Sequence, residues 1–320
     1  MKRSPEQHLF REVERLSITV VTDNYYDALR PDTAISKSYR TRPGRSMHAE
    51  HGLSYFVETV TPSGDSGALM FDYGVDARGV SNNIRLLEID LSRINAFGLS
   101  HGHFDHWGGF IGILKRGRKK IAGGTPLFLG VDAFAHRYSV RPSEGIAQDL
   151  GRLKREEIES LGIVRIVEVT EPTELIPGGY FTGPIERVTP YEHVRPTLKI
   201  KRNGVLEQDQ FPGEQAVVFL VRGKGLVVLS GCAHVGIVNT VMHARKMTDV
   251  DRVHAVVGGF HLVGSDSEAI DATVADIKRL SPDHVIPTHC TGFEAINRFR
   301  EEMADQFHLN TAGTTYTFQA

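Results

Sequence analysis

The feature that most constrains this chain is a histidine-rich stretch directly after an apolar run. Residues 94–99 predict a buried strand, and the following turn carries four potential metal ligands: His101, His103, Asp105 and His106. Alternate residues of an extended backbone point to the same side, so His101 and His103 can bind one cation from a strand end. A turn into a helix would redirect Asp105 and His106 towards a second position. This motif therefore predicts a site for two metal ions.

The alternative is a polar loop whose histidines are incidental. Gly102, Gly108 and Gly109 lie among or directly after the candidate ligands. They permit the tight backbone that a metal-binding turn needs. We therefore favour the metal site.

Two further histidines follow apolar strands in the second half of the chain. The run 226–229 ends in a glycine-bounded turn that carries Cys232 and His234, ahead of an expected helix. The strand expected over 283–286 ends beside His289. Both histidines repeat the arrangement of the first motif and are candidate ligands. For His234 the alternative is a residue beside a helix N-cap that binds no metal.

Two polar residues in other turns, Asn24 and His261, each have two interpretations, and a third, His193, has one. Asn24 follows a strand expected over 16–21 and is either a turn former or a residue that faces the site. His261 follows a strand expected over 252–257 and two glycines that let a backbone approach a ligand. It contacts substrate or metal, or it is satisfied by backbone carbonyls. His193 lies in a loop without a glycine-rich turn, and we interpret it as incidental.

The order His-x-His-x-Asp-His after a strand resembles the metal-binding signature of the metallo-β-lactamase superfamily. The resemblance implies an α/β fold of the αββα type, a sandwich of two mixed β-sheets flanked by helices, with a metal site at one sheet edge. It also implies two ligand sets. The first ion would be held by His101, His103 and His234, and the second by Asp105, His106 and His289.

Two residues that belong to neither ligand set can also be compared with the superfamily. Asp72 ends a strand expected over 68–71 and is similar to the buried aspartate with which the superfamily supports its metal loop. Cys232 stands where many members carry a bridging aspartate. This departure leaves three interpretations of Cys232: a thiolate ligand, a redox-sensitive thiol, or a small core residue. Cys232 and His261 are additional candidate ligands.

Four short segments resemble one branch of the superfamily, the dihydropterin ribofuranosylaminobenzene phosphate synthase-like metallohydrolases. They are residues 50–54, 230–234, 258–262 and 288–292. That branch implies a small-molecule substrate that bears a pterin or a phosphate group. His51, in the first segment, joins Asn24 and His261 as a candidate substrate contact.

The resemblance implies a metal-dependent hydrolase with two divalent ions, with zinc favoured and iron or manganese as alternatives. Such ions lower the pKa of water from 15.7 to about 7, which supplies hydroxide for attack on an ester, amide, phosphoester or lactone. Asp105 is the expected proton acceptor, and Asp72 orients the loop. Diiron oxygen-reducing members carry glutamate at the second motif position, so His103 favours hydrolysis over redox chemistry.

Composition sets the remaining expectations. The chain has 320 residues, 40% of them hydrophobic, which suits one domain over 1–320. We expect a lid-like excursion around 31–51 and a variable insertion around 117–215, with a charged helix over 143–161. The net charge of −2 favours a small-molecule partner over nucleic acid. Two cysteines and the lack of a long apolar run predict a cytoplasmic protein without membrane contact.

Two other functions compete with hydrolysis of a small molecule. A nucleic-acid-processing metallonuclease would need a basic groove or an appended domain, and neither is visible in the sequence. A non-catalytic sensor could use the metal pocket to bind a small ligand, but six intact candidate ligands argue against an inactive site. The sequence makes no prediction about the oligomeric state.

Overall fold

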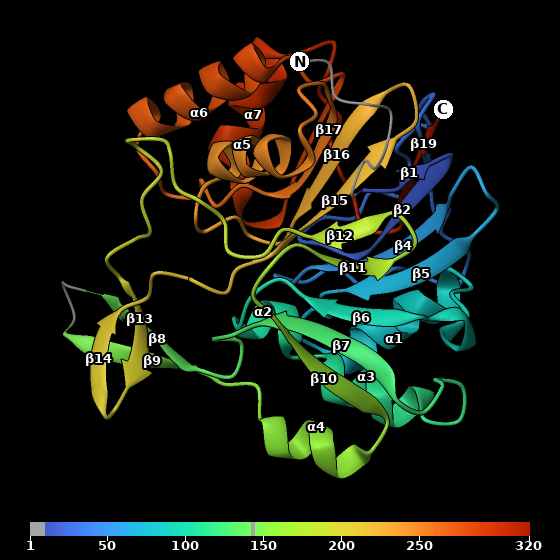
Figure 1. Ribbon diagram of the computed structural model, residues 1–320, viewed down its shortest axis with the longest axis vertical. Coiled ribbons are helices and arrows are strands. Elements are labelled where there is room, and N and C mark those ends of the chain that lie inside the picture. The colour runs from blue at the N-terminus through green and yellow to red at the C-terminus, as the bar shows by residue number, and fades with distance from the viewer. Residues whose placement is uncertain (1–9, 142–144) are drawn as a thin grey trace, which may run out of the picture.

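The computed structural model describes residues 10–141 and 145–320 and has the four-layer α/β architecture that the sequence predicted (Figure 1). Two β-sheets face each other in the middle of the molecule. Helices from the N-terminal half cover one outer face, and helices from the C-terminal half cover the other. Among the described residues, no helix is both long and apolar enough to cross a membrane.

The first sheet has eight strands and belongs mainly to the N-terminal half. Its strand order is β10-β7-β6-β5-β4-β2-β19-β3. Strands β5 and β6 run parallel, with Met70 opposite Phe97. The bounds are β2 (Arg15–Thr22), β3 (Ser36–Ser38), β4 (Ser54–Val60), β5 (Ser66–Phe71), β6 (Ala96–Leu99), β7 (Thr125–Gly130), β10 (Val164–Val169) and β19 (Thr314–Gln319).

The second sheet has seven strands. Its order is β11-β12-β15-β16-β17-β18, and the short β1 pairs with β15. Strands β16, β17 and β18 are parallel neighbours, so their carboxyl ends lie at one edge of the sheet. The bounds are β1 (Glu12–Val13), β11 (Thr173–Ile176), β12 (Gly179–Phe181), β15 (Ala216–Val221), β16 (Gly225–Ser230), β17 (Val253–Gly259) and β18 (His284–Thr288).

The helices complete the outer layers. They are α1 (Ala77–Leu86), η1 (Leu91–Arg93), α2 (Phe104–Trp107), α3 (Phe110–Gly117), α4 (Arg155–Leu161), α5 (Ile237–Thr248), α6 (Ser267–Leu280), η2 (His289–Thr291) and α7 (Phe293–Glu302). The strands predicted over 226–229 and 283–286 are present as β16 and β18, with bounds within two residues of the prediction. Each ends where the predicted turn begins, at Gly231 and at His289.

Three buried apolar clusters hold the layers together. The inner cluster lies between the sheets and joins residues such as Leu69 and Phe219. The second packs the outer face of the eight-stranded sheet against α1, α3 and α4, and the third packs the seven-stranded sheet against α5, α6 and α7. Successive residues of a strand point to opposite faces, so Leu69 enters the inner cluster while Met70 enters the outer one.

The region between 117 and 215 contains a third sheet that the sequence did not predict. It is antiparallel, in the order β14-β13-β8-β9, and extends away from the sandwich (Figure 1). Its strands are β8 (His136–Arg141), β9 (Ile146–Gly151), β13 (Leu198–Arg202) and β14 (Val205–Gln208). The charged helix predicted over 143–161 is therefore wrong in its first half. Residues 143 and 144 lie outside the described part, β9 follows, and only α4 is helical.

The predicted lid segment, 31–51, contributes strand β3 to the sheet edge. Its end is tied to the start of α1, because the Glu50 carboxylate accepts hydrogen bonds from the backbone nitrogens of Val75 and Asp76 at 2.8 and 3.0 Å. Whether the segment acts as a lid stays a prediction.

Candidate metal centre

Side chains from separate strand ends converge at one edge of the sandwich. His101 Nε2 lies 3.1 Å from His234 Nε2, and His289 Nε2 lies 3.2 Å from Asp105 Oδ2. The ring of His103 lies 4.7 Å from that of His234, measured between centroids. These residues and His106 are all at most 7% exposed. All six residues that the sequence proposed as ligands therefore lie together in the folded chain.

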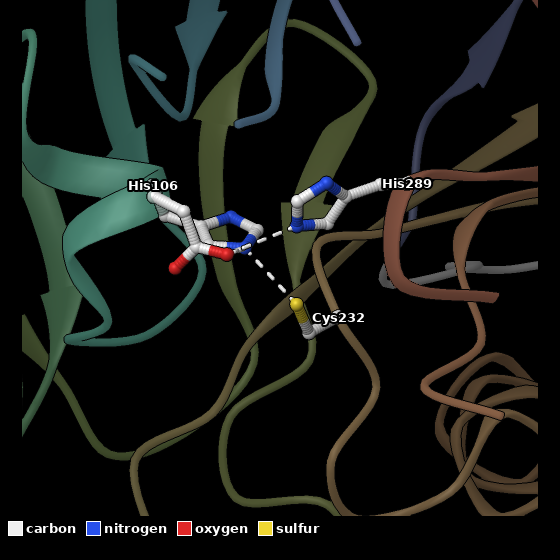
Figure 2. A group of neighbouring side chains, drawn as sticks. His106, Cys232 and His289 are labelled. Atoms are coloured by element: carbon white, nitrogen blue, oxygen red, sulfur yellow. Dashed lines mark hydrogen bonds and ion pairs between the residues drawn. The ribbon is translucent and has the colours of Figure 1, made fainter. Parts of the chain in front are cut away.

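The potential ligand atoms form two adjoining groups, and within each the atoms lie within 4.8 Å of one another. One group contains Asp105, His106, Cys232 and His289, and the other contains His101, Cys232 and His234. In Figure 2, His106, Cys232 and His289 point towards one another from α2, the turn after β16 and η2. His103 joins the second group by its ring contacts with His101 and His234.

Outer hydrogen bonds orient three of the imidazoles. His106 Nδ1 donates to Asp72 Oδ2 at 2.6 Å, because a carboxylate can only accept. The Ser100 hydroxyl also donates to Asp72, so its oxygen accepts from His101 Nδ1 at 2.9 Å. His289 Nδ1 lies 3.2 Å from Asn24 Oδ1. In a neutral ring this leaves each inner Nε2 without a hydrogen, which is the tautomer that binds a metal ion.

The pair His101 and His234 has a nitrogen that protein atoms do not satisfy. Their Nε2 atoms face each other, and His234 Nδ1 is buried without a hydrogen-bond partner among the described residues. If His234 Nε2–H donates to His101, then Nδ1 is a bare, unpaired acceptor. If it does not, two lone pairs face each other. A cation that accepts both Nε2 lone pairs removes the repulsion between them, so the two facing nitrogens fit a metal ion; the His234 Nδ1–H still has no partner among the described residues.

The electrostatics of the two groups suit cations. Burial lowers the pKa of His101, His103 and His234 well below the usual range, so they stay neutral, as metal ligands must. Burial opposes a charge on His289 as well, yet its hydrogen bond to Asp105 raises the pKa of His289 to about 9. Burial also acts to raise the pKa of Asp105, but the charges of His106 and His289 outweigh it and lower that pKa. The group that contains Asp105 and His289 thus favours positive charge beside an ionised carboxylate.

Asp72 is hydrogen-bonded to His106 and Ser100 behind the candidate ligands, and its predicted role as the support of a metal loop stays a prediction. It is fully buried, and its Oδ1 accepts the Ser100 backbone N–H at 2.8 Å. Gly231 packs against this unit, since a Cβ at that position would meet Ser100 Oγ at 2.3 Å and Asp72 Oδ2 at 3.0 Å. Glycine is therefore required where the two sheets bring their turns together.

Strained backbone is concentrated around the centre. Of the nine non-glycine residues with positive φ in the described chain, five lie at it: Asp72, Phe211, Ala233, His261 and His289. Such conformations cost about 1–3 kcal/mol each and persist where the surrounding structure holds them. Here the strand ends must bend sharply to turn their side chains inward.

Two residues of the centre were missed from the sequence. Glu214 is buried and its carboxylate accepts the backbone N–H groups of His234 and Val235 at 2.9 and 2.8 Å. Phe211 stacks on the His234 ring, with centroids 4.0 Å apart and planes 9° from parallel. Both lie in the loop before β15, whose sequence has no local pattern that points to the distant turn they support.

We expect Glu214→Ala to weaken metal binding by about tenfold or more, because the turn that presents His234 loses both acceptors. Competition with a chelator of known affinity measures this. Glu207→Ala is the matched control, since Glu207 is half exposed and pairs with Arg202 away from the centre. Equal metal affinity in the two variants would show that Glu214 does not position His234.

The candidate substrate contacts lie around the ligands. Asn24 holds His289 through two hydrogen bonds, with its Nδ2 donating to the His289 carbonyl at 3.0 Å. The exposed His51 stacks on His289 at 4.8 Å. His261 contacts the His234 ring at 4.0 Å but belongs to neither group of clustered ligand atoms. It lines a small cavity with His193, the histidine interpreted as incidental.

Cys232 lies between the two groups. Its Sγ is 3.0 Å from His106 Nε2 and belongs to both sets of clustered ligand atoms. Burial raises the pKa of its thiol, so the Sγ–H can donate to that nitrogen. Cys232 is also a small residue buried in the core, 2% exposed, so all three interpretations from the sequence stay predictions. Cys232 stays a candidate ligand.

The fold and this site define the class of protein. The sequence model of the metallo-beta-lactamase superfamily matches residues 49–185, which include Asp72 and the His-x-His-x-Asp-His motif. The chain belongs to the metallo-β-lactamase superfamily. This confirms the resemblance and, with it, a fold typical of metal-dependent enzymes.

Within this superfamily, the chain is similar to one named protein sequence and to several solved structures. The chain is 35% identical over 273 residues to the 7,8-dihydropterin-6-methyl-4-(beta-D-ribofuranosyl)-aminobenzene-5'-phosphate synthase of Methanocaldococcus jannaschii, covering 84% of this chain and 90% of that protein. The crystal structure of Tm1679, described as a metal-dependent hydrolase of the beta-lactamase superfamily, aligns with a TM-score of 0.73 at 26% identity, over 95% of this chain and 99% of that one. Zinc-bound PqqB from Methylobacterium extorquens aligns with a TM-score of 0.51 at 13% identity, over 95% and 100% of the two chains, and shows the shared fold alone.

Proposed function

We propose that this protein is a metal-dependent hydrolase that cleaves an ester, phosphoester or lactone bond in a small molecule. The observation that carries the proposal is the convergence of six buried ligand side chains, three of whose imidazoles are hydrogen-bonded so that Nε2 faces inward. In this proposal His101, His103 and His234 hold one divalent ion, and Asp105, His106 and His289 hold a second. The imidazole-rich ligand set favours zinc.

The bound ions supply Lewis acidity, which lowers the pKa of water and neutralises negative charge that develops on the substrate. The chain supplies the rest. Asp105 is ionised and buried beside His289, so one of its oxygens can accept a proton from the attacking water. Asp72 fixes His106 and, through Ser100, His101. His51, which packs on His289, and His261, which packs on His234, contact the substrate.

Turnover by protein loaded with zinc, iron or manganese tests the proposal. The panel contains phosphodiesters, lactones, thioesters and pterin phosphates. We expect hydrolysis of at least one class, loss of that activity with EDTA, and recovery when the favoured metal is added back. A fully metal-loaded protein that hydrolyses no member of the panel would contradict the proposal.

A synthase is the second candidate, because the relative with 35% identity carries that name. That name describes a product with a dihydropterin part and a ribofuranosyl-aminobenzene phosphate part. Mass spectrometry of reactions that contain activated pterin and aminobenzene portions distinguishes the two functions. Formation of the joined product, without hydrolysis of the panel, would favour the synthase.

A further inference from the structure

A cavity of about 920 Å³ lies beside the metal centre. Its walls come from the turn after β2, the outer face of α7 and the segment 304–310, and His289 and Asn24 belong to its lining. His289 therefore contributes both to the candidate metal centre and to this cavity. The volume is at the upper end of the range for small-molecule sites, about 300–1,000 Å³.

Helix α7 presents one face to the cavity and another to the core. The lining residues Phe293, Ile296, Asn297 and Arg300 recur at the three- and four-residue spacing of one helix face. The other face packs inward, where Ala295 and Phe299 are buried in the third apolar cluster. Phe293 and Arg300, at the two ends of the cavity face, are exposed.

Two exposed aromatic side chains line the cavity. Phe293 is 74% exposed and Tyr25 is 46% exposed, and they come from different walls, α7 and the turn after β2. A single exposed apolar residue needs no explanation, but two aromatic rings that line one cavity offer flat apolar surfaces to a ligand ring.

The charge of the lining is positive. Arg30 and Arg300 line the cavity, and neither guanidinium group has a hydrogen bond or ion pair among the described residues. By contrast Arg298, on another face of α7, pairs with Asp271. The acidic lining residue Asp23 is buried, and its oxygens accept hydrogen bonds from the backbone of Asn24 and His289 and from Asn310. Its charge is therefore already compensated.

We propose that this cavity binds the part of the substrate that carries a planar aromatic ring and an oxyanion. The ring packs against Tyr25 and Phe293, and the oxyanion binds Arg30 and Arg300, since guanidinium groups match oxyanions in shape and charge. The reacting bond then lies towards His289. The inference rests on the proposed function only in calling this ligand a substrate.

Calorimetric titration with 1-naphthylmethylphosphonate tests the inference, with methylphosphonate and 1-naphthalenemethanol as the separate anion and ring. We expect the joined probe to bind at least about tenfold more tightly than either part. Arg300→Gln and Phe293→Ala should each weaken it by about tenfold. Both residues are exposed, so the variants should fold normally. Arg298→Gln and Val205→Ala are the matched controls and should bind as the unsubstituted protein does.

The titrations are run on metal-loaded and on EDTA-treated protein. Binding that survives EDTA and falls in the two cavity variants supports the inference. Binding that disappears with the metal, or is equal in cavity and control variants, overturns it, because the phosphonate then binds at the metal centre. Turnover of the ester and lactone panel tests the metal centre separately, so failure of either proposal is distinguishable from failure of the other.

Discussion

His103→Ala is expected to lose most of the bound metal and to reduce turnover by at least about a thousandfold. His103 is buried and neutral, and its ring lies 4.8 Å from that of His101 and 4.7 Å from that of His234, measured between centroids. A bound ion supplies several kcal/mol of transition-state stabilisation, and each 1.4 kcal/mol is a factor of ten in rate. Elemental analysis of the purified variant and its turnover on the best substrate measure both effects.

His136→Ala is the control for this variant. His136 lies on β8, in the third sheet, and pairs with Asp149. This variant should keep its metal and its activity. If His103→Ala also keeps both, the assignment of His103 as a ligand is wrong.

Asp72→Asn is expected to lower metal affinity by about 10–100-fold although Asp72 belongs to neither ligand group. The carboxylate accepts three hydrogen bonds, from Ser100 N, Ser100 Oγ and His106 Nδ1. An amide has one acceptor oxygen, so at least one buried donor would face an NH₂ group. Each donor left unsatisfied costs about 1–3 kcal/mol, so the free energy of unfolding should fall as well.

Chelator competition and urea unfolding measure the two effects of Asp72→Asn. Asp251→Asn is the control, because the Asp251 side chain is 95% exposed and its pairing with Arg245 lies on the surface. If Asp72→Asn lowers the free energy of unfolding but leaves metal affinity unchanged, Asp72 stabilises the fold and does not orient the metal ligands.

The ligands that follow apolar strands were predictable from the sequence because strand and turn signals are local. The run before His101 and the run before Cys232 and His234 are short and apolar, and each is followed by a turn that contains glycine. Such signals place a side chain at a strand end, and parallel strands bring their ends to one edge. That His234 and His289 join the ligands of the first motif was implied by the family resemblance alone.

The supporting residues were not predictable because their contacts are distant in the chain. Glu214 acts on the turn at His234, twenty residues away, and Asp23 accepts the backbone N–H of His289 from 266 residues away. Neither position has a periodic pattern or a special neighbour. The third sheet was missed for a related reason. Four of the six β9 residues are exposed, and its apolar residues Ile146, Ala147 and Leu150 do not alternate with polar ones, so no strand signal was present and the surrounding charges favoured a helix.

The most direct test of the central claim is anomalous diffraction from crystals of the zinc-loaded protein, measured on both sides of the zinc absorption edge. We expect two anomalous peaks, one among His101, His103 and His234 and one among Asp105, His106 and His289. Each peak should lie about 2.0–2.2 Å from the nitrogen and oxygen atoms that bind it. Zinc-loaded crystals with no anomalous peak within that distance of these side chains would contradict the account.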